Sequence, residues 1–330
     1  MLLVQAGGSV MSGHIDAILE FTKVKVNVEI FVLKQDSEDS KKRDLLRLNV
    51  ENKTASEIHK TVLKAINNFV KTGGGLITNE QPYDKYNDSK NTLYFADVCS
   101  EEIQSLEMFG ILDNPPEELT DADNVKGVIT GYFFRIQSQD SYLWAFQSIS
   151  NANIANTKRT LFCGKALTEL KGRFYQFSEE VKFILLDGKL LFKSDSTLAS
   201  LFGFDILIKR KAEDTLNTLS ESGLLSNMDK IVEHYSKNEK RYGKKLMLAR
   251  DSPVFKIPRS QLKTIVTQSI SYSSVIKFNQ NNEIEINSKN DVNNLLKLLN
   301  DEILISEITN RVYDATAKNE IIDEMEVDSS

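Results

Sequence analysis

The segment KFILLDGKLLFK, residues 182–193, is the feature that most constrains the fold of this chain. Apolar residues lie on both sides of Asp187-Gly188, a pair that suits the positive φ values of a two-residue type I′ turn. The segment therefore predicts a β-hairpin. Two apolar, aromatic segments before it, 127–136 and 142–149, indicate adjacent strands. We expect a sheet in the second half of the chain that contains this hairpin.

The rest of the chain mixes strands and helices, which predicts an α+β fold. Residues 24–33 alternate apolar and polar side chains, and residues 45–50 indicate a second strand. From Thr54, apolar residues recur at helical spacing until the glycines at 73–75. Later helices are expected at 196–219, 228–249, 260–270 and 292–299, with short strands at 276–278, 283–286 and 303–313.

Residues 114–124 are the strongest candidate for a linker, because two prolines and several acids cannot build a core. This predicts an N-terminal α+β subdomain at 15–113 and a second α+β domain at 125–316. One continuous domain is the alternative. Residues 1–14 are expected to form a disordered leader, and residues 317–330 a mobile acidic tail.

Composition favours a cytoplasmic, soluble protein. No apolar run in the 330 residues approaches the roughly 18 to 20 residues that span a bilayer. The N-terminus lacks the basic region of a signal peptide. Cys99 and Cys163 are far apart, which suits reduced thiols better than a disulfide framework. Any membrane association is expected to come through a partner.

Charge is distributed unevenly along a chain whose net charge is −6. Residues 74–124 carry an excess of ten acids, and residues 282–330 an excess of eight. Between them, residues 230–263 hold ten Lys and Arg against three acids. Because a local field is set by local charge, this basic segment is the first place to look for a polyanion site.

Residues 237–245, KNEKRYGKK, form the centre of that segment and are called the basic stretch below. On one continuous helix over 228–249, the apolar residues from Ile231 to Leu246 would form one stripe. The cations would occupy the opposite face, where like charges each cost a few tenths of a kcal/mol. A solvated helix face and a site for DNA phosphates are equally weighted interpretations. The predicted DNA contacts are Lys237, Lys240, Arg241, Lys244 and Lys245, extended by Lys209, Arg210, Lys211, Lys158 and Arg159 if the fold brings them near.

The sequence contains few candidate catalytic residues. The three histidines, His14, His59 and His234, are not paired at metal-ligand spacing, so we predict no catalytic residue, no metal site and no cofactor. A metal-dependent nuclease is the alternative, because Glu180-Val181-Lys182 and Asp187-Gly188-Lys189 fit the acid-x-Lys pattern of several nuclease folds. Such triplets arise by chance in a chain with 27% charged residues, and the turn already explains Asp187-Gly188.

The second half of the chain resembles a known family over about residues 125–318. The resemblance rests on the segments GYFFRI, YLWAFQSI followed by Lys158-Arg159, KFILLDGKLLF, FDILIKRKAEDTL and LLKLLNDEILISEITNRVYDATAK. In this order and character they resemble the KwaB family of the Kiwa anti-phage defence system. The resemblance implies a cytoplasmic, homo-oligomeric DNA-binding subunit that works beside a small membrane protein, KwaA, and interferes with phage replication and late expression. It supplies no catalytic residues.

Together these features predict a non-catalytic effector that binds DNA phosphates largely without sequence specificity. The alternatives are the defence nuclease, and a scaffold whose basic face meets a membrane partner or anionic lipid.

Overall fold

The structure is a computed structural model that describes residues 13–24, 26–36, 42–86, 89–98, 107–121, 124–125, 128–138, 141–149, 154–155, 159–163, 166–170, 174–175, 177–305 and 311–315. The chain divides into two compact units. Unit 1 consists of Met1–Tyr83 and Lys90–Phe202, and unit 2 of Asp84–Ser89 and Gly203–Ser330. Unit 1 is built around a sheet and unit 2 mainly from helices, so the predicted α+β class is confirmed.

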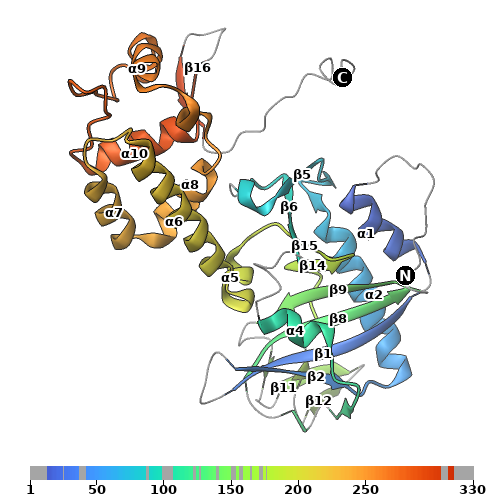
Figure 1. Ribbon diagram of the computed structural model, residues 1–330. Helices are drawn as coiled ribbons and strands as arrows, with labels where there is room; N and C mark the ends of the chain where they lie inside the picture. Colours follow the sequence, from blue (N-terminus) through green and yellow to red (C-terminus); the bar gives the residue numbers. More distant parts are fainter. Residues whose placement is uncertain are drawn as a thin grey trace, which may run out of the picture. The chain divides into compact units, whose positions relative to one another are not determined.

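Unit 1 contains a nine-stranded sheet in the order β5-β6-β15-β14-β9-β8-β1-β2-β7 (Figure 1). Neighbouring strands are antiparallel except for the two outer pairs, β5 with β6 and β2 with β7, which are parallel. The bounds are β1 Asn27–Gln35, β2 Arg43–Leu48, β5 Asn79–Pro82, β6 Thr92–Asp97, β7 Leu119–Thr120, β8 Val128–Ser138, β9 Ser141–Ser148, β14 Phe183–Leu186 and β15 Lys189–Phe192.

The predicted hairpin is confirmed as β14 and β15, which pair in register around Asp187 and Gly188. These two turn residues have φ values of 48° and 72°, as a type I′ turn requires. The hairpin lies inside the large sheet, because β14 pairs with β9 and β15 pairs with β6.

The division into units differs from the predicted boundary at 114–124. β1, which precedes that segment, pairs along its whole length with β8, which follows it. β7 lies inside the segment and pairs with β2 at the edge of the sheet. Strand pairing between distant segments therefore joins the two predicted subdomains in one sheet, although the local composition is that of a linker.

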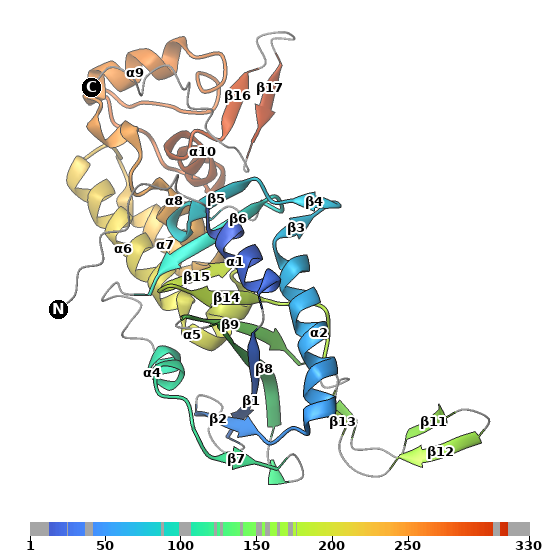
Figure 2. The ribbon, with the colours of Figure 1, turned by 90° about the vertical axis from the view of Figure 1, so that its right-hand side faces the viewer.

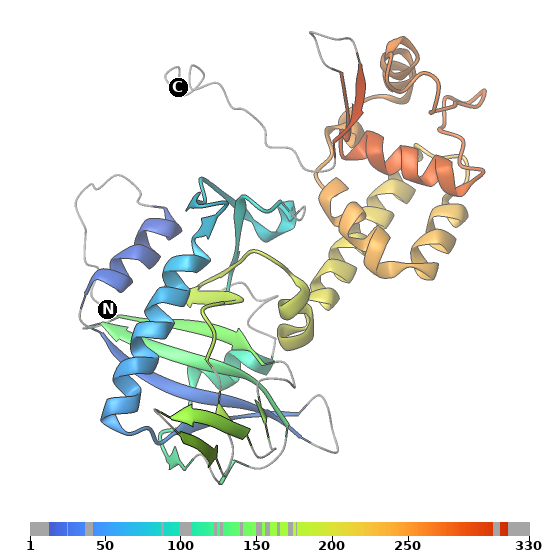
Figure 3. The same cartoon turned by 180° about the vertical axis from the view of Figure 1, so that it is seen from behind.

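Helices cover both faces of this sheet. α1 (His14–Lys23) and α2 (Asn52–Phe69) lie across one face (Figure 3), with Ile18 and Ile66 in the shared core. α4 (Glu107–Asp113) and α5 (Ser196–Phe202) lie on the other side (Figure 2), where the Phe109 and Phe202 rings stack with centroids 4.6 Å apart. Both faces are therefore buried within unit 1.

Two residues of the predicted leader belong to this fold. Gly13 precedes α1 and His14 is its first residue. The Nδ1 of His14 lies 2.6 Å from Oε2 of Glu80. The leader prediction extends too far by these two residues, and residues 1–12 lie outside the described part of the chain.

Smaller elements of unit 1 are β3 Lys71–Thr72, β4 Gly75–Leu76, β10 Ile154–Ala155, β11 Arg159–Cys163, β12 Ala166–Leu170 and β13 Phe174–Tyr175. The 3₁₀ turn η1, Tyr83–Lys85, spans the boundary between the units.

Unit 2 packs its helices around an apolar core that includes Leu216, Leu246 and Leu295. Its elements are α6 Phe204–Ser222, α7 Met228–Lys237, α8 Glu239–Ala249, η4 Pro253–Lys256, α9 Arg259–Gln268, α10 Lys289–Leu299, β16 Ile303–Ile305 and β17 Val312–Asp314. No helix within the described residues has both the length and the apolar composition needed to cross a membrane.

Several predicted elements in this region differ from the structure. The expected helix over 196–219 is interrupted at Gly203, whose φ is 65°. The expected strands at 276–278 and 283–286 are reduced to isolated bridges, among them Phe278 with Ile284. The expected strand over 303–313 is two antiparallel strands, β16 and β17. The predicted acidic tail, 317–330, lies outside the described residues.

Candidate nucleic-acid interface

Asn238 divides the basic stretch between two helices. α7 ends at Lys237 and α8 begins at Glu239, and Asn238 itself has φ −154° and ψ 66°. Its Oδ1 accepts a hydrogen bond from the backbone N–H of Arg241 at 3.2 Å, the geometry of a helix N-cap. The predicted single helix over 228–249 is therefore wrong, because a side chain that prefers capping starts a new helix.

The predicted apolar residues are buried although the helix is interrupted at Asn238. Ile231 and Tyr235 on α7, and Tyr242 and Leu246 on α8, are all buried. Each helix turns its own apolar residues toward the core of unit 2. The five cations, in contrast, differ in what they contact.

Lys245 is held inside the fold. Its Nζ lies 2.7 Å from Oε2 of Glu302, a side chain that is only 5% exposed. The backbone carbonyl of the same lysine accepts a hydrogen bond from Nδ2 of Asn300 at 3.0 Å. Lys245 thus stabilises the contact between α8 and the chain that follows α10, and its charge is already compensated.

Lys244 and Lys237 also have partners. The Nζ of Lys244 lies 4.8 Å from the ring centroid of Tyr86, a cation–π distance. The Nζ of Lys237 lies 2.6 Å from Oε1 of Glu233, which also pairs with Lys230. These hydrogen bonds and charges lower the pKa of Glu233 to about 2. Lys237 remains largely exposed, with its charge shared with a carboxylate.

Lys240 and Arg241 project from the first turn of α8 and are both exposed. Within the described part of the chain, no acidic side chain forms an ion pair with either residue. The guanidinium of Arg241 lies 5.8 Å from the ring centroid of the adjacent Tyr242. These two cations are the ones that the structure leaves available to an external anion.

α6 runs alongside α8 and brings one member of the second basic cluster to the same place (Figure 1). The Nζ of Lys209 lies 3.2 Å from Oε1 of Glu239 in the first turn of α8. Lys211 lies elsewhere, near Asp251. A hydrogen bond from Arg250 is the main cause that lowers the pKa of the Asp251 carboxyl, and the charge of Lys211 lowers it further. Arg210 is exposed on α6. We call Lys209, Lys237, Lys240 and Arg241 the α8 basic face.

The described member of the third predicted cluster belongs to the other unit. Lys158 is outside the described residues, and Arg159 is the first residue of β11, in unit 1. Sequence reasoning in turn missed Tyr86 and Glu302, which engage Lys244 and Lys245. Both lie far along the chain from the basic stretch, so no local pattern could have identified them.

One acid-x-Lys triplet lies just before β14, and the other forms the turn between β14 and β15. Glu180 forms an ion pair with Lys182 of its own triplet. Lys189 instead pairs with Asp97 on the neighbouring strand, its Nζ 2.7 Å from Oδ2. Asp187 is an exposed turn residue. Across the residues that the structure describes, no three His, Cys, Asp or Glu side chains gather where they could hold a metal ion.

Two comparisons with known proteins point to the same family. The profile of a family described as "Kiwa protein KwaB-like" matches residues 126–309, more than half of the chain. The chain is also 24% identical over 218 residues to "Kiwa protein KwaB" of Escherichia coli O55:H7 (strain RM12579 / EPEC). That alignment covers 63% of this chain and 66% of the relative, just under two thirds of its length. No solved structure matches the chain.

Proposed function

Because the chain belongs to the KwaB-like family of the Kiwa anti-phage defence system, we propose that it acts in defence by binding DNA through the α8 basic face. The proposed contact is with phosphates, made first by Lys240 and Arg241 and then by Lys209 and Lys237. The proposed role is non-catalytic.

The observation that carries this proposal is the position of Lys240 and Arg241 in the first turn of α8. The positive end of a helix dipole disfavours cations there, by about 0.3–1 kcal/mol each at low ionic strength. A bound phosphate would reverse this repulsion, because it attracts both the side chains and the N–H groups of the first turn that Asn238 does not cap. An arrangement that costs stability without a ligand and gains it with an anion supports an anion-binding role.

The carboxylates on the same surface set the expected strength of binding. Glu233 and Glu239 already engage Lys237 and Lys209, so a phosphate must compete with them for these two lysines. We therefore expect affinity in the non-specific range, a Kd of about 10⁻⁴–10⁻⁶ M at physiological salt. Phosphate contacts carry no sequence information, so unrelated duplexes should bind alike.

Two further features of the proposal come from the family resemblance. A KwaA-like membrane protein would bring this chain to the membrane, and homo-oligomerisation would link several basic faces on one DNA molecule. Linked sites raise avidity without any new contact. A weak site on each chain is therefore compatible with tight binding by an assembly.

The test is the binding of purified protein to two labelled duplexes of unrelated sequence. Replacing both Lys240 and Arg241 with Gln should weaken binding about tenfold or more, and equally on both duplexes, because only phosphates are contacted. The matched control is Lys53→Gln with Lys60→Gln on α2, which removes the same charge from exposed residues of unit 1. Equal weakening by both double variants would show that general charge, not the α8 basic face, governs binding.

A further inference from the structure

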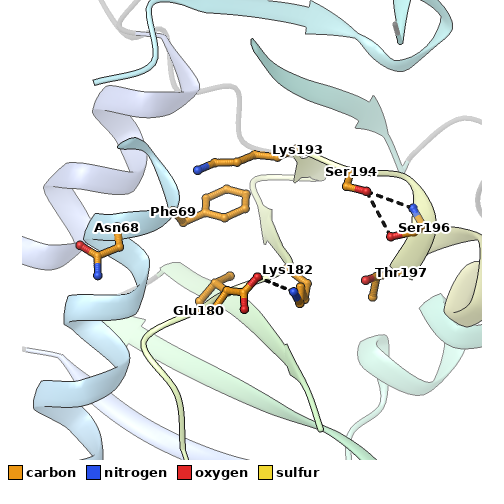
Figure 4. Close-up of a pocket in the computed structure, with 9 residues that line it drawn as sticks. Asn68, Phe69, Glu180, Lys182, Lys193, Ser194, Ser196 and Thr197 are labelled. Carbon is orange, nitrogen blue, oxygen red and sulfur yellow. Dashed lines mark hydrogen bonds and ion pairs between the residues drawn. The ribbon is translucent and has the colours of Figure 1, made fainter. Parts of the chain in front are cut away.

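A second site candidate lies in unit 1, at the open end of the β14–β15 hairpin. A pocket of about 220 Å³ is found there. Three segments form it: the end of α2, the residues just before β14, and the residues from the end of β15 to the start of α5 (Figure 4). The side chains lining it are mainly lysines and hydroxyl residues.

Two lysines occupy opposite positions at this end of the hairpin, just beyond the last paired residues. The last paired residues of the ladder are Phe183 and Phe192, so Lys182 and Lys193 are the next residues on the two strands. Like charges opposite each other on adjacent strands destabilise a sheet. Glu180 pairs with Lys182 but is itself 70% exposed, so it only partly relieves the repulsion.

Lys193 is held in a fixed position. Its Nζ donates a hydrogen bond to the backbone carbonyl of Lys71 at 2.8 Å and lies 5.4 Å from the ring centroid of Phe69. Burial lowers the pKa of Lys193, and the charge of Glu180 opposes that shift. A second anion beside this ammonium group would stabilise its charged form.

Hydroxyl groups complete the opposite side of the pocket. Ser194 and Ser196 lie with their Oγ atoms 3.1 Å apart, and Thr197 lines the wall next to them. Figure 4 shows these residues on one side, with Lys193 above and Glu180 and Lys182 below. Hydroxyl donors and ammonium groups that line one small space suit the oxygens of a tetrahedral anion.

We propose that this pocket binds a single phosphate group, either as inorganic phosphate or as a small phosphomonoester. Its volume is below the roughly 300 Å³ at which pockets for drug-sized ligands begin, so a small anion fits best. A metal ion is a poorer match, because Glu180 is the only carboxylate among the lining residues. The proposal is independent of DNA binding, which was assigned to residues of unit 2.

Isothermal titration of the full chain with inorganic phosphate, and separately with adenosine 5′-monophosphate, tests this proposal. We expect one site per chain with a Kd of about 1 mM or tighter for at least one probe. Lys182→Met and Lys193→Met should each weaken binding about tenfold or more, and Ser196→Ala less, because a charged donor contributes more than a neutral one. Binding of the nucleotide would identify a phosphomonoester site, and binding of inorganic phosphate alone a site for the free anion.

Lys189→Met is the matched control, because this lysine lies on the same hairpin but pairs with Asp97 outside the pocket. It should leave phosphate binding unchanged. Lys193→Arg keeps the charge and should retain part of the affinity, which separates loss of a ligand contact from loss of the fold. The absence of saturable binding with both probes overturns the proposal. So does binding that survives both lysine substitutions but is lost when Lys240 and Arg241 are replaced with Gln.

Discussion

The Nζ of Lys245 lies 2.7 Å from Oε2 of Glu302, and this ion pair separates one member of the basic stretch from the others. Glu302 is almost fully buried, whereas Lys240 and Arg241 on the same helix are exposed. Residues that look alike in the sequence therefore have different roles: one lysine stabilises unit 2, and its neighbours are available to a ligand. Measurements of unfolding free energy and of DNA binding can therefore test the two roles separately.

Lys245→Met should destabilise the protein by about 1.5–3 kcal/mol, because it leaves a buried carboxylate without its charged partner. Urea denaturation gives the free energy of unfolding. Lys240→Met, one turn earlier on α8, is the control and should change it by less than about 0.5 kcal/mol. If the two substitutions have the same effect on stability, the ion pair with Glu302 does not hold Lys245 in solution.

The pKa of Glu233 should be about 2 in the folded protein, against 4.5 for an unperturbed glutamate, because it accepts hydrogen bonds from Lys237 and Lys230. A depressed folded-state pKa means that these contacts stabilise the fold above pH 4.5 and lose that effect as the pH falls toward 2. Carbon-13 NMR of the Glu233 carboxyl measures the midpoint. Lys237→Met should raise it, and Lys240→Met should not. A midpoint near the unperturbed value in the native protein would contradict the two ion pairs.

Gly131 and Gly243 should respond in opposite ways to replacement by Ala. A Cβ at Gly131 in β8 would overlap the ring of Phe146 and lie 2.8 Å from the carbonyl oxygen of Gln147, so Ala should cost about 1–3 kcal/mol. A Cβ at Gly243 in α8 would lie 3.4 Å from Cγ2 of Ile208, an ordinary contact. Ala is there expected to stabilise the helix by up to about 1 kcal/mol. Thermal unfolding compares the two variants, and destabilisation by Ala at Gly243 would show that α6 and α8 pack more closely than described.

The elements that sequence alone could predict are those with a local cause. The β14–β15 hairpin follows from Asp187-Gly188 and its flanking apolar residues, and α2 from helical periodicity. α1 was missed although Ile15, Ile18 and Leu19 have helical spacing, and the break at Asn238 was missed although Asn is a preferred N-cap. In both cases the signal was present in the sequence.

Other features have no local cause. The pairing of β1 with β8 joins segments about 100 residues apart and removes the predicted boundary at 114–124. The contacts of Lys245 with Glu302 and of Lys244 with Tyr86 likewise depend on the tertiary fold. The pocket is an intermediate case. A correctly predicted hairpin register already places Lys182 opposite Lys193, but the hydroxyl side of the pocket depends on where α5 packs.

The salt dependence of DNA binding tests the central proposal most directly, because each phosphate contact contributes about 0.9 to the slope of log Kobs against log salt concentration. Four contacts by the α8 basic face predict a slope of about −3 to −4 for each binding site. Replacing Lys240 and Arg241 with Gln should flatten it by about 2, whereas Lys245→Met should leave it unchanged. A slope that the double substitution does not alter would contradict the account, since the α8 basic face would then be a solvated surface without a role in DNA binding.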